Sequence, residues 1–251
     1  MKTQQTTTTR QLPSAFRPLK YALILGTAVL LPATCAFSEE IAAWTFATDS
    51  GKPTTSGAPV VSAESTPGNE WPLTQTPKDA ESPLVYKENT HDNVSKYPLM
   101  VEFPNVKPDL RGYLHNAEFN SLVGRKSWRI DMEVTFETVS GAVLLEIGGT
   151  ERGRLCVMRE FKSGLRINQL RHFDAKIEGI TFEPKKPYKF SLIKEDKKLS
   201  VEINGESHEV TSGSPVISGP GISIGGPATV SYAILVGSIS AIGIQSTEST
   251  E

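Results

Sequence analysis

A tyrosine and a histidine two residues apart, Tyr113 and His115, are the side chains whose types and spacing most directly suggest catalysis. They follow Arg111 in the segment Arg111-Gly-Tyr-Leu-His115. On a β-strand, residues i and i+2 project from the same face, so Tyr113 and His115 would lie side by side. A Tyr or His base beside an Arg that neutralises a carboxylate could abstract a proton from a uronate sugar. The alternative, which we favour, is an edge strand that carries ordinary polar residues.

A second group of residues suggests anion binding. Within eighteen residues the chain holds four arginines and an asparagine: Arg154, Arg159, Arg166, Arg171 and Asn168. Guanidinium groups bind carboxylates and sulfates through paired hydrogen bonds. We therefore consider a contact with an acidic glycan made by Arg154, Arg166, Asn168 and Arg171. The alternative is a solvated sheet face on which the arginines pair with Asp131, Glu133 and Glu160.

Proteins that bind neutral sugars normally use exposed aromatic side chains for stacking. The sequence has three tryptophans, and the apolar surroundings of Trp44 and Trp128 predict that both are buried. Trp71 lies in a polar, Pro-rich segment and is the one tryptophan that we expect to be an exposed platform.

Other catalytic and metal-binding patterns are missing from the sequence. His91, His172 and His208 are scattered without metal-ligand spacing, and there is no nucleophile-elbow, phosphate-loop or dinucleotide motif. Cys156 lies in the apolar stretch Leu155-Cys-Val-Met158, which favours a buried, inert thiol over a nucleophile.

The N-terminal 36 residues have the pattern of a secretory signal peptide. A basic segment with four cations precedes the apolar run 21–31, Pro32 and the small residues up to Ala36. We expect cleavage after Ala36 and a secreted, periplasmic or extracellular location. The apolar run is short for a membrane anchor, so we expect no membrane span after cleavage. A further alternative is a lipoprotein anchored through Cys35, although Pro32 and Thr34 depart from the usual acylation signal.

Composition excludes several classes of protein. With 38% hydrophobic and 22% charged residues the chain is not wholly disordered. Two cysteines cannot build a disulfide scaffold or a four-cysteine zinc site. The 26 basic and 28 acidic residues give a net charge of -2. Removal of the four basic residues of the signal leaves 22 basic against 28 acidic residues, a net charge of -6, so we expect no nucleic acid partner.

Hydrophobic alternation predicts an all-β domain. In the segment 128–137 apolar and polar residues alternate strictly, which is typical of a half-buried antiparallel strand. Asn204-Gly205 predicts a hairpin turn between two such runs. Further short strands are expected at 99–103, 113–119, 141–147, 153–159, 164–170, 188–194, 221–224, 232–236 and 238–244. Many short strands with Gly-rich turns indicate an antiparallel two-sheet β-sandwich of the jelly-roll type.

The expected organisation follows from these patterns. Residues 37–47 form a first strand, and the Pro-, Ser- and Thr-rich residues 48–95 form a loop or linker. The jelly-roll domain covers 96–245, and residues 246–251 are a disordered tail.

The order of these segments resembles the concanavalin A-like lectin/glucanase superfamily, and in particular its laminin-G-like domains. The matching pieces are Trp44-Thr-Phe46, Ala142–Gly149, Gly164-Leu-Arg-Ile167, Leu199–Gly205, Ile224-Gly225 and Val236–Ile239. Two departures are visible. The acidic pair that often follows the last strand motif is Ser240-Ala241 here, and no Asp matches the calcium ligand of many laminin-G-like domains.

The resemblance implies a jelly roll that binds sugars or proteins, with calcium as a cofactor in some members, or else a glycosidase or polysaccharide lyase. Laminarinase-type glucanases of the superfamily carry Glu-x-Asp-x-Glu on one strand. The corresponding residues here are Arg129, Asp131 and Glu133, so one acid is replaced by arginine. Since glycoside hydrolysis needs two carboxylates, we interpret this strand as a solvated face with an Arg–carboxylate pair. We therefore expect a secreted, non-catalytic recognition module whose partner is a glycan or a surface protein. The alternatives are a carbohydrate-active enzyme of the same fold and a structural envelope protein without a ligand.

Overall fold

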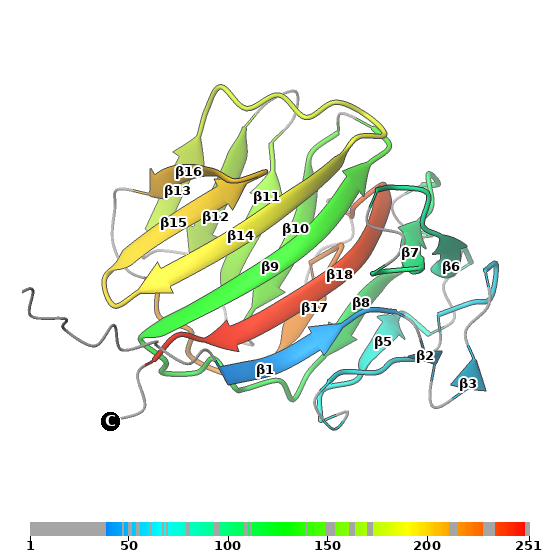
Figure 1. The fold of residues 1–251 in the computed structure, drawn as a ribbon, viewed down its shortest axis with the longest axis horizontal. Coiled ribbons are helices and arrows are strands. Elements are labelled where there is room, and N and C mark those ends of the chain that lie inside the picture. The colour runs from blue at the N-terminus through cyan, green and yellow to red at the C-terminus, as the bar shows by residue number, and fades with distance from the viewer. Residues whose placement is uncertain are drawn as a thin grey trace, which may run out of the picture. The chain divides into compact units, whose positions relative to one another are not determined.

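Eight strands form the front sheet, which faces the viewer in Figure 1. Its strands follow the spatial order β16-β15-β14-β9-β18-β7-β6, and β1 also pairs with β18. Their bounds are β1 (Glu39–Trp44), β6 (Val85–Glu88), β7 (Leu99–Phe103), β9 (Ser127–Phe136), β14 (Pro187–Glu195), β15 (Lys198–Ile203), β16 (Glu206–Val210) and β18 (Gly237–Ser246). All of these neighbours pair antiparallel.

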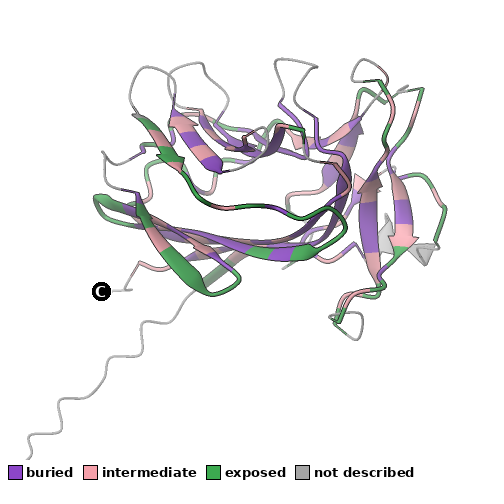
Figure 2. Cartoon of the chain, turned by 90° about the horizontal axis from the view of Figure 1, so that it is seen from above, coloured by how far each residue is buried: buried purple, intermediate pink, exposed green. Residues whose placement is uncertain are grey.

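A second antiparallel sheet of eight strands, the back sheet, follows the order β13-β12-β11-β10-β17-β8-β5-β4. Its members are β4 (Ser62–Ala63), β5 (Leu73–Thr76), β8 (Tyr113–Asn116), β10 (Ala142–Ile147), β11 (Leu155–Arg159), β12 (Leu165–Gln169), β13 (Phe173–Ile177) and β17 (Ile222–Ile224). Two short strands, β2 (Thr48–Asp49) and β3 (Lys52–Pro53), form a separate hairpin. The two large sheets make two layers (Figure 2), which confirms the predicted β-sandwich.

The computed structural model describes residues 39–46, 48–49, 52–53, 56–60, 62–66, 68, 70–78, 81–92, 96–107, 110, 112–138, 140–148, 154–160, 164–169, 173–210, 215–227 and 234–248. The predicted signal peptide and Cys35 lie outside them, and so do Arg111, Arg171 and His172. Within these ranges no helix is long and apolar enough to cross a membrane.

The core lies between the sheets and is built by side-chain alternation. Along β9 every second residue from Trp128 to Val134 is buried, as the sequence predicts. Trp44 and Trp128 are both fully buried, and the Trp44 indole nitrogen donates a hydrogen bond to the Trp71 carbonyl oxygen over 2.9 Å. This bond satisfies the indole N–H, which is the one polar group of the Trp44 side chain. Burial of that side chain stabilises the fold by about 2–3 kcal/mol.

The expectation of a loop or linker over 48–95 is wrong for much of that segment. Strands β4 and β5 belong to the back sheet and β6 belongs to the front sheet. Leu73, Leu84 and Tyr86 from this segment are fully buried. Each strand is only two to four residues long, so the Pro, Ser and Thr residues between the strands dominate the local composition and conceal them.

Two further expectations need correction, and one observed strand was not expected. Strand β18 extends to Ser246, and the Glu248 carboxylate accepts a hydrogen bond of 2.6 Å from the Lys126 amide, so residues 246–248 are not a free tail. The predicted strand at 232–236 reduces, among its described residues, to an isolated bridge at Ile234. Strand β13 was not predicted from the sequence, although Phe173-Asp-Ala-Lys-Ile177 alternates between apolar and charged residues.

Two glycines with the same backbone angle give a test of the packing. Gly225 and Gly124 both have φ of 75°, but a Cβ at Gly225 would lie 2.0 Å from the buried Phe103 ring, whereas one at Gly124 meets nothing within 4 Å. We expect Gly124→Ala to lower the free energy of unfolding by about 1–2 kcal/mol through backbone strain alone. Gly225→Ala should lower it by a further 1–3 kcal/mol, roughly, through overpacking. Urea titration of both variants measures the difference, and equal losses would show that Phe103 moves aside without cost.

Candidate functional site

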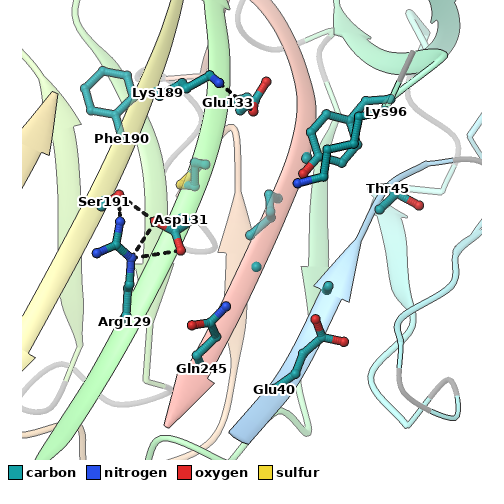
Figure 3. A pocket seen from close by; sticks show the side chains of 16 residues that line it. Glu40, Thr45, Lys96, Arg129, Asp131, Glu133, Lys189, Phe190, Ser191 and Gln245 are labelled. Carbon is teal, nitrogen blue, oxygen red and sulfur yellow. Dashed lines mark hydrogen bonds and ion pairs between the residues drawn. The ribbon is translucent and has the colours of Figure 1, made fainter. Parts of the chain in front are cut away.

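A row of small side chains forms the floor of a groove on the outer face of the front sheet. Alternation along β18 points Ala241 and Gly243 outward, and the strand register places Ala43 of β1 beside Gly243. The strands on either side of this floor carry long polar side chains outward. The hollow between them has a volume of about 390 Å³. Figure 3 shows the labelled side chains on both sides of β18.

One wall of the groove is a hydrogen-bonded network centred on Arg129 of β9. The Arg129 Nε atom lies 2.9 and 3.0 Å from the two carboxylate oxygens of Asp131. One of its terminal nitrogens donates to the Ser191 hydroxyl over 2.8 Å, and Ser191 in turn donates to Asp131. The same nitrogen lies 3.2 Å from a Glu202 carboxylate oxygen. The side chains of this wall are therefore held in place by bonds within the protein.

The opposite wall comes from the connection between β6 and β7 and from β1. Lys96 and Tyr97 of the connection line the groove. In Figure 3, Lys96, Thr45 and Glu40 lie on the side of β18 opposite Arg129 and Asp131. The Lys96 ammonium lies 4.8 Å from the centre of the Tyr97 ring, and its interaction with Tyr97 raises the pKa of Lys96. Lys96 thus remains a cation at neutral pH.

The stem of this connection is held by Asn89. Its side-chain amide donates to the Tyr97 carbonyl oxygen over 2.6 Å, and its backbone amide donates to the Pro98 carbonyl oxygen over 3.0 Å. These bonds fix the backbone at Tyr97. The position of the Tyr97 ring at the groove therefore does not depend on a hydrogen bond made by its hydroxyl group.

The charges that line the groove balance. Three cations, Lys96, Arg129 and Lys189, face three carboxylates, Glu40, Asp131 and Glu133. The Arg129–Asp131 pair confirms the Arg–carboxylate pair expected on this strand, and Lys189 lies 3.8 Å from Glu133. A groove rich in donors and acceptors but without net charge suits a ligand that offers hydroxyl groups more than one that offers a formal charge.

Tyr113 and His115 lie on the other sheet, in β8, and share a face as predicted, with ring centres 6.1 Å apart. The expected edge strand is wrong, because β8 pairs with β17 on one side and with β5 on the other. The His115 Nδ1 atom lies 2.9 Å from the Ile222 carbonyl oxygen and 3.0 Å from the Ser223 hydroxyl. Burial lowers the pKa of His115 and raises the pKa of Tyr113. Both side chains are therefore neutral at pH 7, and neither lines the groove.

Arg154 and Arg166 also belong to the back sheet side of the molecule, and each has carboxylate partners. Arg154 lies 3.5 Å from the buried Glu146 carboxylate. Arg166 makes two 2.7 Å bonds to Asp174 and lies 3.7 Å from Glu160. The expected pairing with Glu160 is confirmed.

The expected pairing of these arginines with Asp131 and Glu133 is wrong, because those acids project from β9 in the front sheet. Asn168 stands between Cys156 and Asp174 in the strand register. Arg171 lies outside the described residues. Arg159 points inward instead, with its guanidinium 4.5 Å from the centre of the Phe136 ring.

The expectation that Trp71 is an exposed platform is also wrong. Its side chain is partly buried and packs against the core, with its ring centre 5.3 Å from that of Phe119. Its backbone amide donates to the Ser65 hydroxyl over 2.9 Å. Pro and Ser residues around Trp71 made the segment look solvated, but the chain folds back here to cover the edge of the core.

Metal binding has little support among the residues that the structure describes. They include no group of three or more His, Cys, Asp or Glu side chains that could hold an ion. The calcium site that the family resemblance suggested therefore has no fitting donor set in this part of the chain.

Two comparisons with known proteins gave no match: no family model and no curated protein matches the sequence. Solved structures share the fold. Domain 4 of AbnA, a GH43 extracellular arabinanase from Geobacillus stearothermophilus solved with arabinotriose, matches with a TM-score of 0.57 and 11% identity over 83% of this chain and 93% of that one. The binding domain of botulinum neurotoxin DC, in complex with rat synaptotagmin II, matches at 0.54 and 9% identity over 85% of this chain and 49% of that one.

A sialidase from Trypanosoma rangeli, in complex with sialic acid, matches with a TM-score of 0.51 and 14% identity, over 84% of this chain and 31% of the enzyme. The chain thus spans about a third of the sialidase and half of the toxin chain. At these identities the similarity establishes the β-sandwich fold alone.

Sequence reasoning missed the groove residues Tyr97, Gln245 and Gly243. A signal for the floor does exist in the sequence: the outward positions of 238–245 include Ala241 and Gly243, where a solvated strand would carry longer polar side chains. No comparable signal marks Tyr97, which reaches the groove only through the path of the β6–β7 connection.

Cys156 gives a chemical test of the back sheet. Burial raises the pKa of its thiol to about 12, so almost no thiolate exists at pH 8 and alkylation should be very slow. We expect iodoacetamide at pH 8 to leave Cys156 unmodified in the folded full chain and to modify it fully in urea. Mass spectrometry of the peptide that contains Cys156 measures both states, with the urea-treated sample as the reference for full modification. Rapid labelling of Cys156 without denaturant would show that the thiol is open to solvent.

Proposed function

We propose that this protein is a secreted, non-catalytic recognition module of the concanavalin A-like type that binds a neutral carbohydrate in the front-sheet groove. The observation that carries the proposal is the groove itself. It has a floor of small residues, Ala43, Ala241 and Gly243, between walls of hydrogen-bonding side chains whose charges cancel. A sugar ring needs such a flat, open floor and several fixed donors and acceptors around it.

The ligands of the structural neighbours support a carbohydrate as the ligand; of the two sugars, arabinotriose is uncharged and sialic acid carries a carboxylate. The arabinanase domain and the sialidase were each solved with a sugar, arabinotriose and sialic acid respectively. The groove differs from a site for an acidic sugar, because its arginine is already bonded to Asp131 and Glu202. We therefore place the ligand on the front sheet and propose that it is uncharged, in contrast to the acidic glycan considered for Arg154 and Arg166.

A glycosidase is the second candidate, and one observation favours it. Asp131 and Glu133 project from the same face of β9, about 7 Å apart along the strand at a rise of about 3.4 Å per residue, and paired carboxylates at such a separation can hydrolyse glycosides. Against this, both Asp131 oxygens accept hydrogen bonds from Arg129, and Ser191 donates a further one. These bonds occupy the carboxylate within the protein, so it is poorly placed to exchange a proton with a ligand.

A steric block tests the proposed site. A Cβ at Gly243 would meet nothing within 4 Å, so Gly243→Leu should fill the groove without straining the fold. We expect the wild-type chain to be retarded in affinity electrophoresis by at least one neutral polysaccharide, and Gly243→Leu to lose that retardation. The free energy of unfolding should change by less than about 0.5 kcal/mol, as for other surface substitutions.

Arg166→Ala is the matched control on the opposite sheet. Its ion pairs are partly exposed, so its loss should cost less than about 1 kcal/mol of stability and leave neutral-glycan binding intact. Binding to acidic polysaccharides alone, abolished by Arg166→Ala and not by Gly243→Leu, would contradict the proposed site. Release of reducing ends from a bound polysaccharide, lost in Asp131→Asn, would replace the recognition module by the glycosidase.

A further inference from the structure

A second hollow adjoins the groove on the same face of the front sheet. It has a volume of about 360 Å³ and is lined by His91, Asp92, Glu133, Pro187, Tyr188, Lys189 and Asn204. Glu133 and Lys189 line both hollows. The two hollows are therefore neighbours along β9 and β14, with this pair of residues at their common boundary.

The boundary between the two hollows is the Lys189–Glu133 ion pair, and its lysine side chain is free to change rotamer toward solvent. The Lys189 side chain is 71% exposed, and its ammonium lies 3.8 Å from the Glu133 carboxylate. The Glu133 side chain is only 18% exposed, so Lys189 is the exposed partner of the pair. A single ion pair of this length to an exposed lysine contributes little to stability, so a ligand can displace the Lys189 side chain at small cost. In Figure 3 the pair lies at the end of the groove opposite Glu40 and Gln245.

One connection borders both hollows. Its first arm carries His91 and Asp92 into the second hollow, and its second arm carries Lys96 and Tyr97 into the groove. The His91 amide donates to the Asn89 side-chain oxygen over 3.0 Å, and the His91 Nε2 atom lies 2.9 Å from the Thr135 hydroxyl of β9. Together with the Asn89 bonds that hold Tyr97 and Pro98, these contacts fix both arms along the same side of the sheet.

The length of the combined hollow exceeds what one sugar ring can fill. From Arg129 in the groove to the level of Thr135 and Pro187, which pair across the strands, β9 advances six residues, roughly 20 Å at about 3.4 Å per residue. A ligand that touches both ends must be extended and must run along the strands.

We propose that the two hollows are one binding cleft for the interior of a linear, neutral oligosaccharide chain, which passes over the Glu133–Lys189 pair. This inference rests on the proposed function and adds the size and shape of the ligand. It makes Asp92 and Asn204 contact residues for the sugars beyond the groove, and it makes His91 a positioning residue that acts through the connection. A single monosaccharide, in contrast, occupies only the groove and does not reach the second hollow.

A length series tests the cleft. The full chain is titrated calorimetrically with arabino-oligosaccharides and with cello-oligosaccharides, from disaccharide to hexasaccharide. In the series that binds, the affinity should rise on the order of tenfold or more from the shortest to the longest member. A tenfold rise corresponds to about 1.4 kcal/mol of binding free energy. Asp92→Trp, which fills the second hollow from an exposed position, should return the longest member to the affinity of the shortest and leave the shortest unchanged.

Glu206→Trp is the matched control, because Glu206 is exposed at the start of β16 and lines neither hollow. It should leave the whole series unchanged. A wild-type affinity that reaches its plateau at the disaccharide, or an equal loss for short and long chains in Asp92→Trp, would overturn the extended cleft while leaving the proposed function standing. If no member of either series binds and Gly243→Leu changes nothing in the polysaccharide screen, the proposed function fails with it.

Discussion

Strand β18 carries the constraint on which the front sheet depends. It pairs with β9 along its whole length, with β7 near its start and with β1 near its end. Its inward residues Ile239, Ile242 and Ile244 are buried in the core. A register slip between Ile239 and Ala241 keeps the isoleucines inward on both sides of the irregularity. Because side chains alternate, the same pairing fixes Ala241 and Gly243 outward, so the core and the groove floor are set by one register.

The two outer faces of the sandwich use polar residues differently. On the front sheet the Arg129 network forms one border of an open hollow and keeps its charged groups partly exposed. On the back sheet the exposure of the charged side chains varies: Glu146 is only 4% exposed beside Arg154 and Cys156, whereas the Arg166 and Asp174 side chains are 40% and 53% exposed. A buried charge such as that of Glu146 requires a partner within the protein. Arg154, which the sequence suggested as a ligand contact, serves as that partner.

Much of the fold follows from the sequence, and less of the site does. The alternation of Trp128–Phe136, the Asn204-Gly205 turn and the all-β class are all visible in the pattern of residue types. Strands β4, β5 and β6 were missed because a strand of two to four residues is too short for periodicity to show. The groove was missed because its residues come from β1, β9, β14, β18 and the β6–β7 connection, which are far apart in the sequence. Small residues such as Gly243 contribute by leaving space above the sheet, and no sequence motif marks such a space. Conversely, Trp71 was assigned from its polar neighbours, although tertiary packing decides whether an aromatic ring is covered.

The position of β18 also has a kinetic consequence. Among the described strands of the front sheet, β18 comes last along the chain, yet it occupies an interior place in that sheet, between β9 and the strands β1 and β7. Until residues 237–246 are available, β9 on one side and β1 and β7 on the other have no common partner, and their edges stay unpaired. A nascent chain cannot complete this sheet step by step from its N-terminus, and closure must bring together residues separated by about 200 positions, a non-local pairing that makes folding slow. The front sheet therefore closes only when residues 237–246 are available, and a chain that stops before them exposes open strand edges, which favour aggregation.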